Sequence, residues 1–178
     1  IEYPANQKTL TKRYTEESIK FIKENKDGPF FLYLPHTMVH LPLAVSKEFE
    51  GRTGRLIWDA IEEVDWSVGQ ILKTVKELKI ADNTLVVFTS DNGPEKTWTK
   101  RAELHRHQTN GIYREGKRSI YEGGHRVPFF IRWPAKVKAG STWDEPVCQT
   151  DLLATFAEMV GAKLPPDAGE DSDSFYMG

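Results

Sequence analysis

The sequence predicts an α/β protein with a mostly parallel sheet, because short apolar runs alternate with amphipathic helical patterns. Phe30–Leu34 is a continuous apolar run, typical of a strand covered on both faces. Apolar residues then recur at three- and four-residue steps over 57–78, which predicts a long helix. Leu85–Phe88 is a second apolar run. This order of strand, helix and strand predicts a βαβ unit with a parallel pair of strands and a right-handed crossover.

Further elements are predicted on both sides of this unit. Thr15, followed by two glutamates, indicates a helix start, and Asp27–Gly28 would end that helix. Residues 127–133 are a third strand candidate, and the proline near its start favours a sheet edge. Residues 150–160 are amphipathic and predict a helix. The polar, aperiodic stretch 94–116 predicts a long functional loop.

The composition is that of an ordinary globular domain. Of the 178 residues, 39% are hydrophobic and 28% are charged. The net charge of -2 gives no support for binding nucleic acid through bulk charge. The longest apolar run is Phe30–Leu34, which is too short to span a membrane. The single cysteine, Cys148, excludes an internal disulfide, and we expect its thiol to be buried ahead of a helix.

Polar side chains follow the second apolar run directly. Ligands collect beyond the carboxyl ends of strands in open α/β sheets, which is where Asp91 and Asn92 lie in the predicted fold. Both side chains offer hard oxygen donors that suit magnesium or calcium, and Gly93 would let the backbone turn sharply after them. The same Asp-Asn-Gly-Pro sequence is also strong turn chemistry, so a plain turn remains the alternative.

His40 follows the first predicted strand, and its backbone is restricted by the Leu41-Pro42 pair that comes next. A histidine at this place could donate to an anionic oxygen or protonate a leaving group near neutral pH. His36, at the start of the same loop, fits a structural role better. If the parallel pair forms, both histidines lie at the same sheet edge as Asp91.

A glycine-rich basic segment follows the long loop. The pair Gly123 and Gly124 indicates either positive φ angles or a close approach of two backbones. Lys117 and Arg126 bring positive charge to this neighbourhood, although the lysine could equally be a solvated surface charge. Arg126 and Glu122 fit a structural ion pair.

One run of acidic residues carries no predicted chemistry. It lies on the long predicted helix, where most of its side chains are expected to face solvent. Its members are Asp59, Glu62, Glu63 and Asp65.

Three separate segments together resemble the type I sulfatase family. They are Phe30–Pro35 with His40–Pro42, then Phe88–Gly93, then Gly116–Pro128. Their order and spacing are far more specific than any one of them, and the resemblance covers nearly the whole chain. It implies part of an alkaline-phosphatase-like fold, a three-layer sandwich of a large sheet between helices. It also implies that residues 1–178 form a single, incomplete domain, the middle-to-late portion of a sulfatase catalytic domain.

The resemblance implies roles for individual residues. Asp91 and Asn92 resemble two ligands of the family's calcium ion, for which magnesium is the weaker candidate. Lys117 and His40 resemble groups that bind the sulfate and assist departure of the alcohol, so both are expected to be catalytic and substrate-binding. His107 is a further candidate for touching a sugar substrate, with a plain surface position as the alternative. A metal, an ammonium and an imidazole around a sulfuryl group would stabilise developing charge.

Two parts of the family pattern are missing from this sequence. Family members use a formylglycine nucleophile made within a Cys/Ser-x-Pro-x-Arg motif, and two further acidic metal ligands near the N-terminus; neither is present here. Cys148 is followed by Gln149 and Thr150, which does not fit the motif. The chain also begins with neither a methionine nor a signal peptide. We therefore expect a partial chain that is inactive alone, with formylglycine in the missing N-terminal part and a weak or empty metal position.

The expected function of the complete protein is hydrolysis of sulfate esters, with carbohydrate sulfates as the favoured substrates. A phosphatase, phosphodiesterase or phosphonate hydrolase of the same superfamily is the first alternative. A non-catalytic chain that retains the fold is the second. The expected partners are a sulfated small molecule or polysaccharide and the missing remainder of the catalytic domain. Family analogy implies a periplasmic, secreted or lysosomal location.

Overall fold

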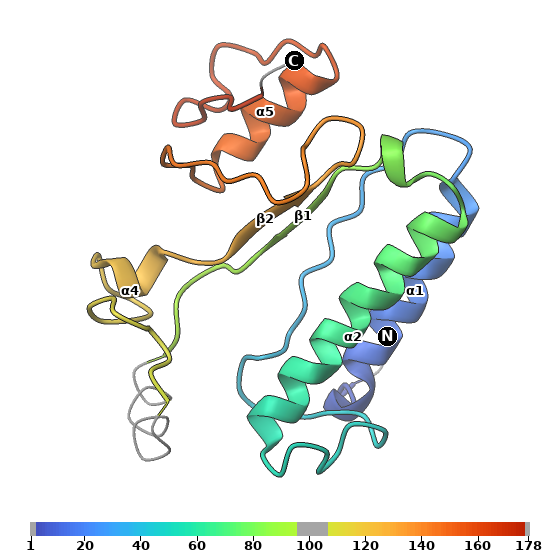
Figure 1. Cartoon of the computed structure of the whole chain (residues 1–178), viewed down its shortest axis with the longest axis vertical. Coiled ribbons are helices and arrows are strands. Elements are labelled where there is room, and N and C mark those ends of the chain that lie inside the picture. The colour runs from blue at the N-terminus through green and yellow to red at the C-terminus, as the bar shows by residue number, and fades with distance from the viewer. Residues whose placement is uncertain (1–2, 96–106, 177–178) are drawn as a thin grey trace. The chain divides into compact units, whose positions relative to one another are not determined.

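The computed structural model describes residues 3–95 and 107–176. Contacts divide the chain into two compact units, Ile1–Ala139 and Gly140–Gly178. The elements in chain order are η1 (Gln7–Thr9), α1 (Leu10–Asn25), α2 (Leu56–Glu77), η2 (Ala81–Asn83), β1 (Val86–Thr89), α4 (Glu122–His125), β2 (Phe129–Arg132) and α5 (Asp151–Met159) (Figure 1). None of the helices formed by the described residues has both the length and the apolar character needed to cross a membrane.

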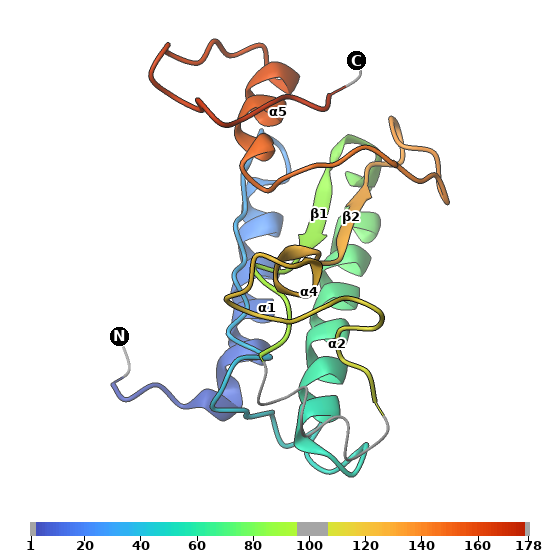
Figure 2. The ribbon, with the colours of Figure 1, turned by 90° about the vertical axis from the view of Figure 1, so that its left-hand side faces the viewer.

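Helices α1 and α2 lie side by side in the first unit (Figures 1 and 2). Ile22 of α1 and Val75 of α2 are almost completely buried, at 2% and 1% exposure. Two hydroxyl groups also meet in this interface, where Thr15 Oγ1 and Ser67 Oγ are hydrogen-bonded over 2.6 Å. Because both hydroxyls have a partner, burying them carries no large desolvation cost.

The long helix α2 confirms the periodicity over 57–78, whereas α1 begins earlier than predicted. It starts at Leu10, not near Thr15. The Thr15 hydroxyl does not cap a helix end; it donates to the Thr11 carbonyl oxygen over 2.7 Å and accepts from the Ser67 hydroxyl on α2. Since Thr15 is only 1% exposed, helix packing explains this threonine.

The loop between the helices packs onto α2 through an apolar cluster. Its buried members are Met38, Ala44, Val45, Phe49 and Ala60, and Leu43, Val64 and Trp66 pack against them. The cluster holds both ends of the segment that contains His40, because Met38 precedes this histidine and Ala44 follows it. The position of His40 therefore depends on this packing.

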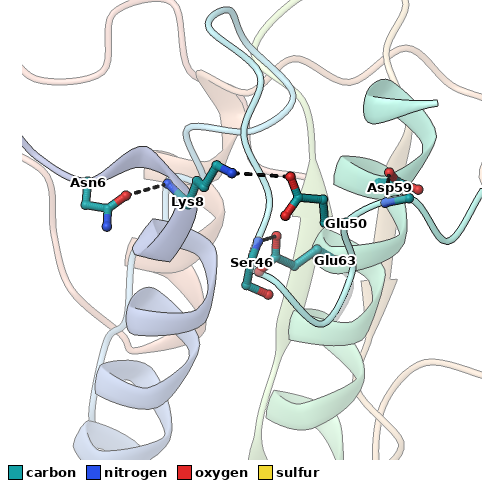
Figure 3. A network of polar contacts seen from close by, with 7 residues as sticks. Asn6, Lys8, Ser46, Glu50, Asp59 and Glu63 are labelled. Atoms are coloured by element: carbon teal, nitrogen blue, oxygen red, sulfur yellow. Dashed lines mark hydrogen bonds and ion pairs between the residues drawn. The ribbon is translucent and has the colours of Figure 1, made fainter. Parts of the chain in front are cut away.

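Two carboxylates of α2 fix the same loop. Asp59 accepts hydrogen bonds from the hydroxyl and N–H of Thr53 and from the N–H of Gly51, at 2.7 to 2.9 Å. These bonds, the hydroxyl first, lower the pKa of Asp59. Glu63 accepts from the N–H of Ser46 over 3.0 Å (Figure 3). The expectation that the acidic run mostly faces solvent is wrong for Asp59 and Glu63, which are 2% and 1% exposed, because both turn back onto loop N–H groups.

The strands β1 and β2 pair with each other in antiparallel fashion (Figure 2). Phe88 lies opposite Phe130, and their ring centroids are 6.3 Å apart. The predicted strands at 85–88 and 127–133 are thus confirmed, with bounds shifted by one or two residues. The sequence had not indicated that these two strands are neighbours.

The predicted parallel pair is not formed in the part of the chain that the structure describes. Its sheet contains only β1 and β2, and 30–34 joins no ladder. Phe31 and Tyr33 are 72% and 76% exposed, so one face of this run lacks the cover that its apolar composition led us to expect. The prediction is wrong for the described chain because no described segment supplies that cover or a neighbouring strand.

The second unit is built on α5, which confirms the helix predicted over 150–160. Of its residues only Thr155 is buried, at 3% exposure. Cys148 is exposed just before this helix, so the expectation of a buried thiol is wrong. Its N–H donates to the Asp151 carboxylate over 2.6 Å, and a hydrogen bond with the Thr150 hydroxyl lowers the pKa of the Cys148 thiol. A short helix with one buried residue offers no core in which to enclose a sulfur.

Candidate functional site

Direct backbone contacts join the end of β1 to the glycine-rich segment. The Gly93 N–H donates to the Gly124 carbonyl over 2.9 Å, and the Lys117 N–H donates to the Pro94 carbonyl over 2.8 Å. We call residues 93–95 and 114–124 together the strand-end framework. Since its two parts are bonded through their main chains, Lys117 is fixed close to the end of β1.

Glycines make this framework possible because no side chain would fit between the backbones. A Cβ atom at Gly93 would lie 1.9 Å from the Gly123 oxygen, and one at Gly116 would lie 2.4 Å from the Pro94 oxygen. A Cβ atom at Gly124 would also be within 2.1 Å of a carbonyl oxygen. Neither Gly123 nor Gly124 has a positive φ. Of the two predicted reasons for these glycines, close approach is therefore the one that the structure confirms.

Lys117 lies half-buried between two residues of unusual conformation. Glu115 and Arg118 have φ angles of +65° and +74°, in the left-handed region that costs a residue other than glycine about 1–2 kcal/mol. Arg118 Nη1 donates to Glu95 Oε2 over 2.5 Å. Within residues 3–95 and 107–176, the structure gives the Lys117 ammonium no hydrogen-bond or ion-pair partner, so its charge is available to an anion.

Contacts between cations and aromatic rings stiffen the loop that carries Lys117. The Arg114 guanidinium carbon lies 3.8 Å from the ring centroid of Tyr121, and that of Arg126 lies 4.9 Å from the ring of Tyr113. Arg126 also donates to Glu122 over 2.7 Å, which lowers the pKa of that carboxyl and confirms the structural ion pair. No spacing rule in the sequence could have found the two ring contacts.

Asp91 and Asn92 follow β1 as an exposed and a half-buried residue. The Asn92 Nδ2 donates to the Gly93 carbonyl over 3.2 Å, which leaves Oδ1 as an acceptor for another group. Ser90 Oγ donates to the Asn92 carbonyl over 3.1 Å and orders the turn. The turn and the metal interpretations are thus compatible, because the same short segment can do both.

The donors after β1 fit part of a calcium site. Calcium takes six to eight oxygen ligands, and Asp91 and Asn92 offer side-chain oxygens of the type it prefers. No group of three or more His, Cys, Asp or Glu residues that could hold a metal occurs among the described residues. A calcium ion bound here would need further ligands from outside that part of the chain.

The two histidines of the 36–42 segment differ in their surroundings. His40 is exposed, and its Nδ1 lies 2.7 Å from the Leu41 carbonyl oxygen. Because a carbonyl only accepts, Nδ1 carries a proton and Nε2 remains for another partner. His36 is half-buried with Nε2 3.4 Å from Ser67 Oγ, and burial lowers the pKa of its imidazole. These surroundings fit the structural role expected of His36.

The structure brings some of the predicted site residues together and leaves others apart. Lys117 joins the segment that carries Asp91 and Asn92, whereas no described contact links His40 to these three residues. His107 is exposed, and its ring stands perpendicular to that of Trp58 on α2, with centroids 4.9 Å apart. Residues 96–106, about half of the predicted functional loop, lie outside the described residues.

Among the described residues, the Lys117 ammonium without a partner and the side-chain oxygens of Asp91 and Asn92 lie on segments that meet after β1. They suit a metal-assisted site for an anionic ester. Comparison with known proteins agrees: the Sulfatase family model matches residues 2–162. The chain belongs to the sulfatase family.

Individual relatives also show membership of the sulfatase family. Human steryl-sulfatase is 43% identical over 169 residues, and N-acetylgalactosamine-6-O-sulfatase from Bacteroides thetaiotaomicron is 40% identical over 163 residues. These alignments cover 94% and 89% of this chain but 29% and 32% of the relatives. The chain thus spans about a third of the length of the relatives it matches.

Solved structures confirm the fold class. A structure from work on glycosaminoglycan metabolism by Bacteroides thetaiotaomicron aligns with a TM-score of 0.89 at 37% identity, covering 96% of this chain and 36% of that one. The PsFucS1 sulfatase from Pseudoalteromonas sp. aligns with a TM-score of 0.79 at 27% identity, covering 93% and 34%. The described elements are therefore part of the alkaline-phosphatase-like fold of sulfatases.

Substituting Gly93→Ala is expected to lower the free energy of unfolding by about 1–3 kcal/mol, because the new Cβ forces the two backbones apart. Chemical denaturation of the complete protein measures this change. Gly69→Ala is the matched control: nothing lies within 4 Å of a Cβ there. In mid-helix that variant should gain about 0.5–1 kcal/mol. A Gly93→Ala protein as stable as the wild type would contradict the close backbone contact.

Proposed function

We propose that the complete protein is a sulfuric ester hydrolase that acts on sulfate esters, with sulfated carbohydrates as its substrates. The observation that carries the proposal is the position of Lys117, whose N–H is bonded to Pro94 just after Asp91 and Asn92. Membership of the sulfatase family supports the reaction. Relatives named as N-acetylgalactosamine-6-sulfatases, one bacterial and one human, support a sugar substrate. The steryl-sulfatase relatives make a sterol sulfate the competing substrate.

Each candidate site residue of this chain would have a separate role in the reaction. The Lys117 ammonium would bind the anionic oxygens of the sulfate and stabilise charge that develops on them. His40, oriented by its Nδ1–H bond to Leu41, would act as an imidazolium and donate the proton on Nε2 to the departing alcohol oxygen. Asp91 and Asn92 would hold calcium, which when bound supplies further positive charge for the sulfate. His107 would contact the sugar.

The site is completed by the rest of the catalytic domain under this proposal. Two oxygen donors are too few for calcium. The sequence also lacks the Cys/Ser-x-Pro-x-Arg motif in which a formylglycine would form, and the exposed Cys148 lies outside any such motif. We therefore assign the nucleophile and the remaining metal ligands to other parts of the protein. The isolated chain is expected to be inactive.

The proposed reaction is tested with the purified complete protein on 4-nitrophenyl sulfate and 4-nitrophenyl phosphate. The sulfate ester should be the better substrate, and Lys117→Ala should lower kcat/KM by about 10²–10³, the usual effect of removing one group that stabilises transition-state charge. Lys20→Ala, an exposed lysine on α1, is the control and should leave kcat/KM unchanged. Faster cleavage of the phosphate ester would indicate a phosphatase instead, and no cleavage of either would indicate a non-catalytic protein.

The role of His40 is tested by comparing two leaving groups. His40→Ala should lower kcat by about 10²–10⁴ on an alkyl or sugar sulfate, whose alcohol leaves poorly without a proton. The loss on 4-nitrophenyl sulfate should be much smaller, because nitrophenolate leaves unaided. Any general damage to folding cancels in the ratio of the two rates. Equal losses on both substrates would rule out proton donation by His40.

The calcium proposal is tested by titration calorimetry of the complete protein. Asp91→Asn should weaken calcium binding by ten-fold or more, about 1.4 kcal/mol, because a charged oxygen ligand becomes neutral. Asp82→Asn is the control, since Asp82 is an exposed residue just before the other end of β1. If both variants bind calcium as the wild type does, Asp91 is not a ligand.

A further inference from the structure

Arg118, next to Lys117, combines a strained backbone with a charged contact across the strand-end framework. Its φ is +74°, in the region that favours glycine, yet it is an arginine with a largely exposed side chain. Its guanidinium donates to Glu95, whose side chain is only 27% exposed. The residue with the strained backbone is therefore also the residue whose side chain makes the ion pair with Glu95.

The consecutive residues Lys117 and Arg118 are thus hydrogen-bonded to another consecutive pair, Pro94 and Glu95. Lys117 donates through its backbone N–H to Pro94, and Arg118 donates through its side chain to Glu95. A single hydrogen bond fixes one point but lets the chain rotate about it. A second bond one residue further along removes that rotation. On the other side of Lys117 the Gly116 backbone lies close against the Pro94 carbonyl, since an added Cβ there would be 2.4 Å from the Pro94 oxygen.

The segment that receives both bonds is the one that carries the predicted metal ligands. Pro94 and Glu95 follow Asp91 and Asn92 within a few residues. The two bonds therefore set Lys117 relative to these oxygen donors directly, without passing through the rest of the fold. The ammonium that they orient has no partner of its own among the described residues.

We propose that Arg118 and Glu95 are positioning residues for Lys117: their ion pair holds the backbone at Arg118 in the left-handed conformation and so fixes the direction of the Lys117 ammonium. This inference rests on the proposed role of Lys117 in binding sulfate. Neither positioning residue needs to touch the substrate. An ion pair with one largely exposed partner contributes little to stability, so its effect is expected on binding and rate rather than on unfolding.

The test uses Arg118→Gln, Glu95→Gln and the double variant of the complete protein. Each single change should lower kcat/KM on 4-nitrophenyl sulfate about five-fold, the scale of one exposed ion pair. The inhibition constant for inorganic sulfate should rise by a similar factor, because the group that binds the anion has moved. The double variant should lose clearly less than the product of the two single losses, since the two residues share one contact. The melting temperature should hardly change.

The matched control breaks a different arginine–glutamate pair. Arg52 and Glu62 form an ion pair at 2.9 Å with comparable exposure, in the loop before α2 and on α2 itself. Arg52→Gln should leave kcat/KM and sulfate inhibition unchanged. Independent, additive losses in the Arg118 and Glu95 variants, or an equal loss in Arg52→Gln, would overturn the proposal.

A second pair of variants separates backbone conformation from surface charge. Arg118→Gly and Arg118→Ala both remove the guanidinium, but only glycine accepts a φ of +74° without strain. The glycine variant should therefore retain about five times the kcat/KM of the alanine variant or more, the rate equivalent of the cost of a left-handed alanine. Equal activities would show that Arg118 acts through its charge alone, which overturns the positioning role.

If the wild-type protein cleaves no sulfate ester, that result contradicts the proposed function only. The positioning role of Arg118 and Glu95 can still be tested. Hydrogen–deuterium exchange of a peptide spanning 114–120 reports on the bond from the Lys117 N–H to Pro94. Arg118→Gln should raise the exchange rate of this peptide several-fold, whereas Arg52→Gln should not. Unchanged exchange in Arg118→Gln would overturn the proposal independently of any activity.

Discussion

The candidate site depends on one constraint, the direct contact of two backbones at the end of β1. A side chain at Gly93 would collide with the Gly123 carbonyl oxygen, and a side chain at Gly123 would collide with the Glu115 carbonyl oxygen. This contact brings the segment after the strand and the loop around Lys117 into one framework, although the two are well separated in the sequence. Hydrogen bonds from main-chain donors then fix the register, so Lys117 is placed by backbone geometry rather than by its own side chain.

The remainder of the first unit supports a different part of the proposed site. The apolar cluster around Val45 and Ala60 holds the loop that contains His40 against α2. The buried carboxylates Asp59 and Glu63 act alongside it by accepting loop N–H groups. A loop without regular structure thereby gains a defined path, because its polar backbone groups are satisfied by the helix on which it packs.

What this chain supplies to the proposed site is incomplete in two physical respects. Its oxygen donors, Asp91 and Asn92, are fewer than calcium requires. Its run at 30–34 has the composition of a covered strand but exposes Phe31 and Tyr33. Both observations agree with a chain that spans about a third of the length of its sulfatase relatives. The described residues supply neither the further calcium ligands nor a sheet partner for 30–34.

The sequence by itself determined the local features: the helix α2 from its apolar period, the strand β1 with Asp91 and Asn92 after it, and a pair of glycines that required either positive φ angles or a close approach of two backbones. The tertiary structure decided that β1 pairs with β2 in antiparallel fashion, that Asp59 and Glu63 are buried, and that Arg118 meets Glu95. The physical reason is the separation in sequence over which each kind of interaction acts. Periodicity and turn chemistry act between near neighbours in the chain, whereas strand pairing, burial of a carboxylate and a distant ion pair depend on which segments folding brings together.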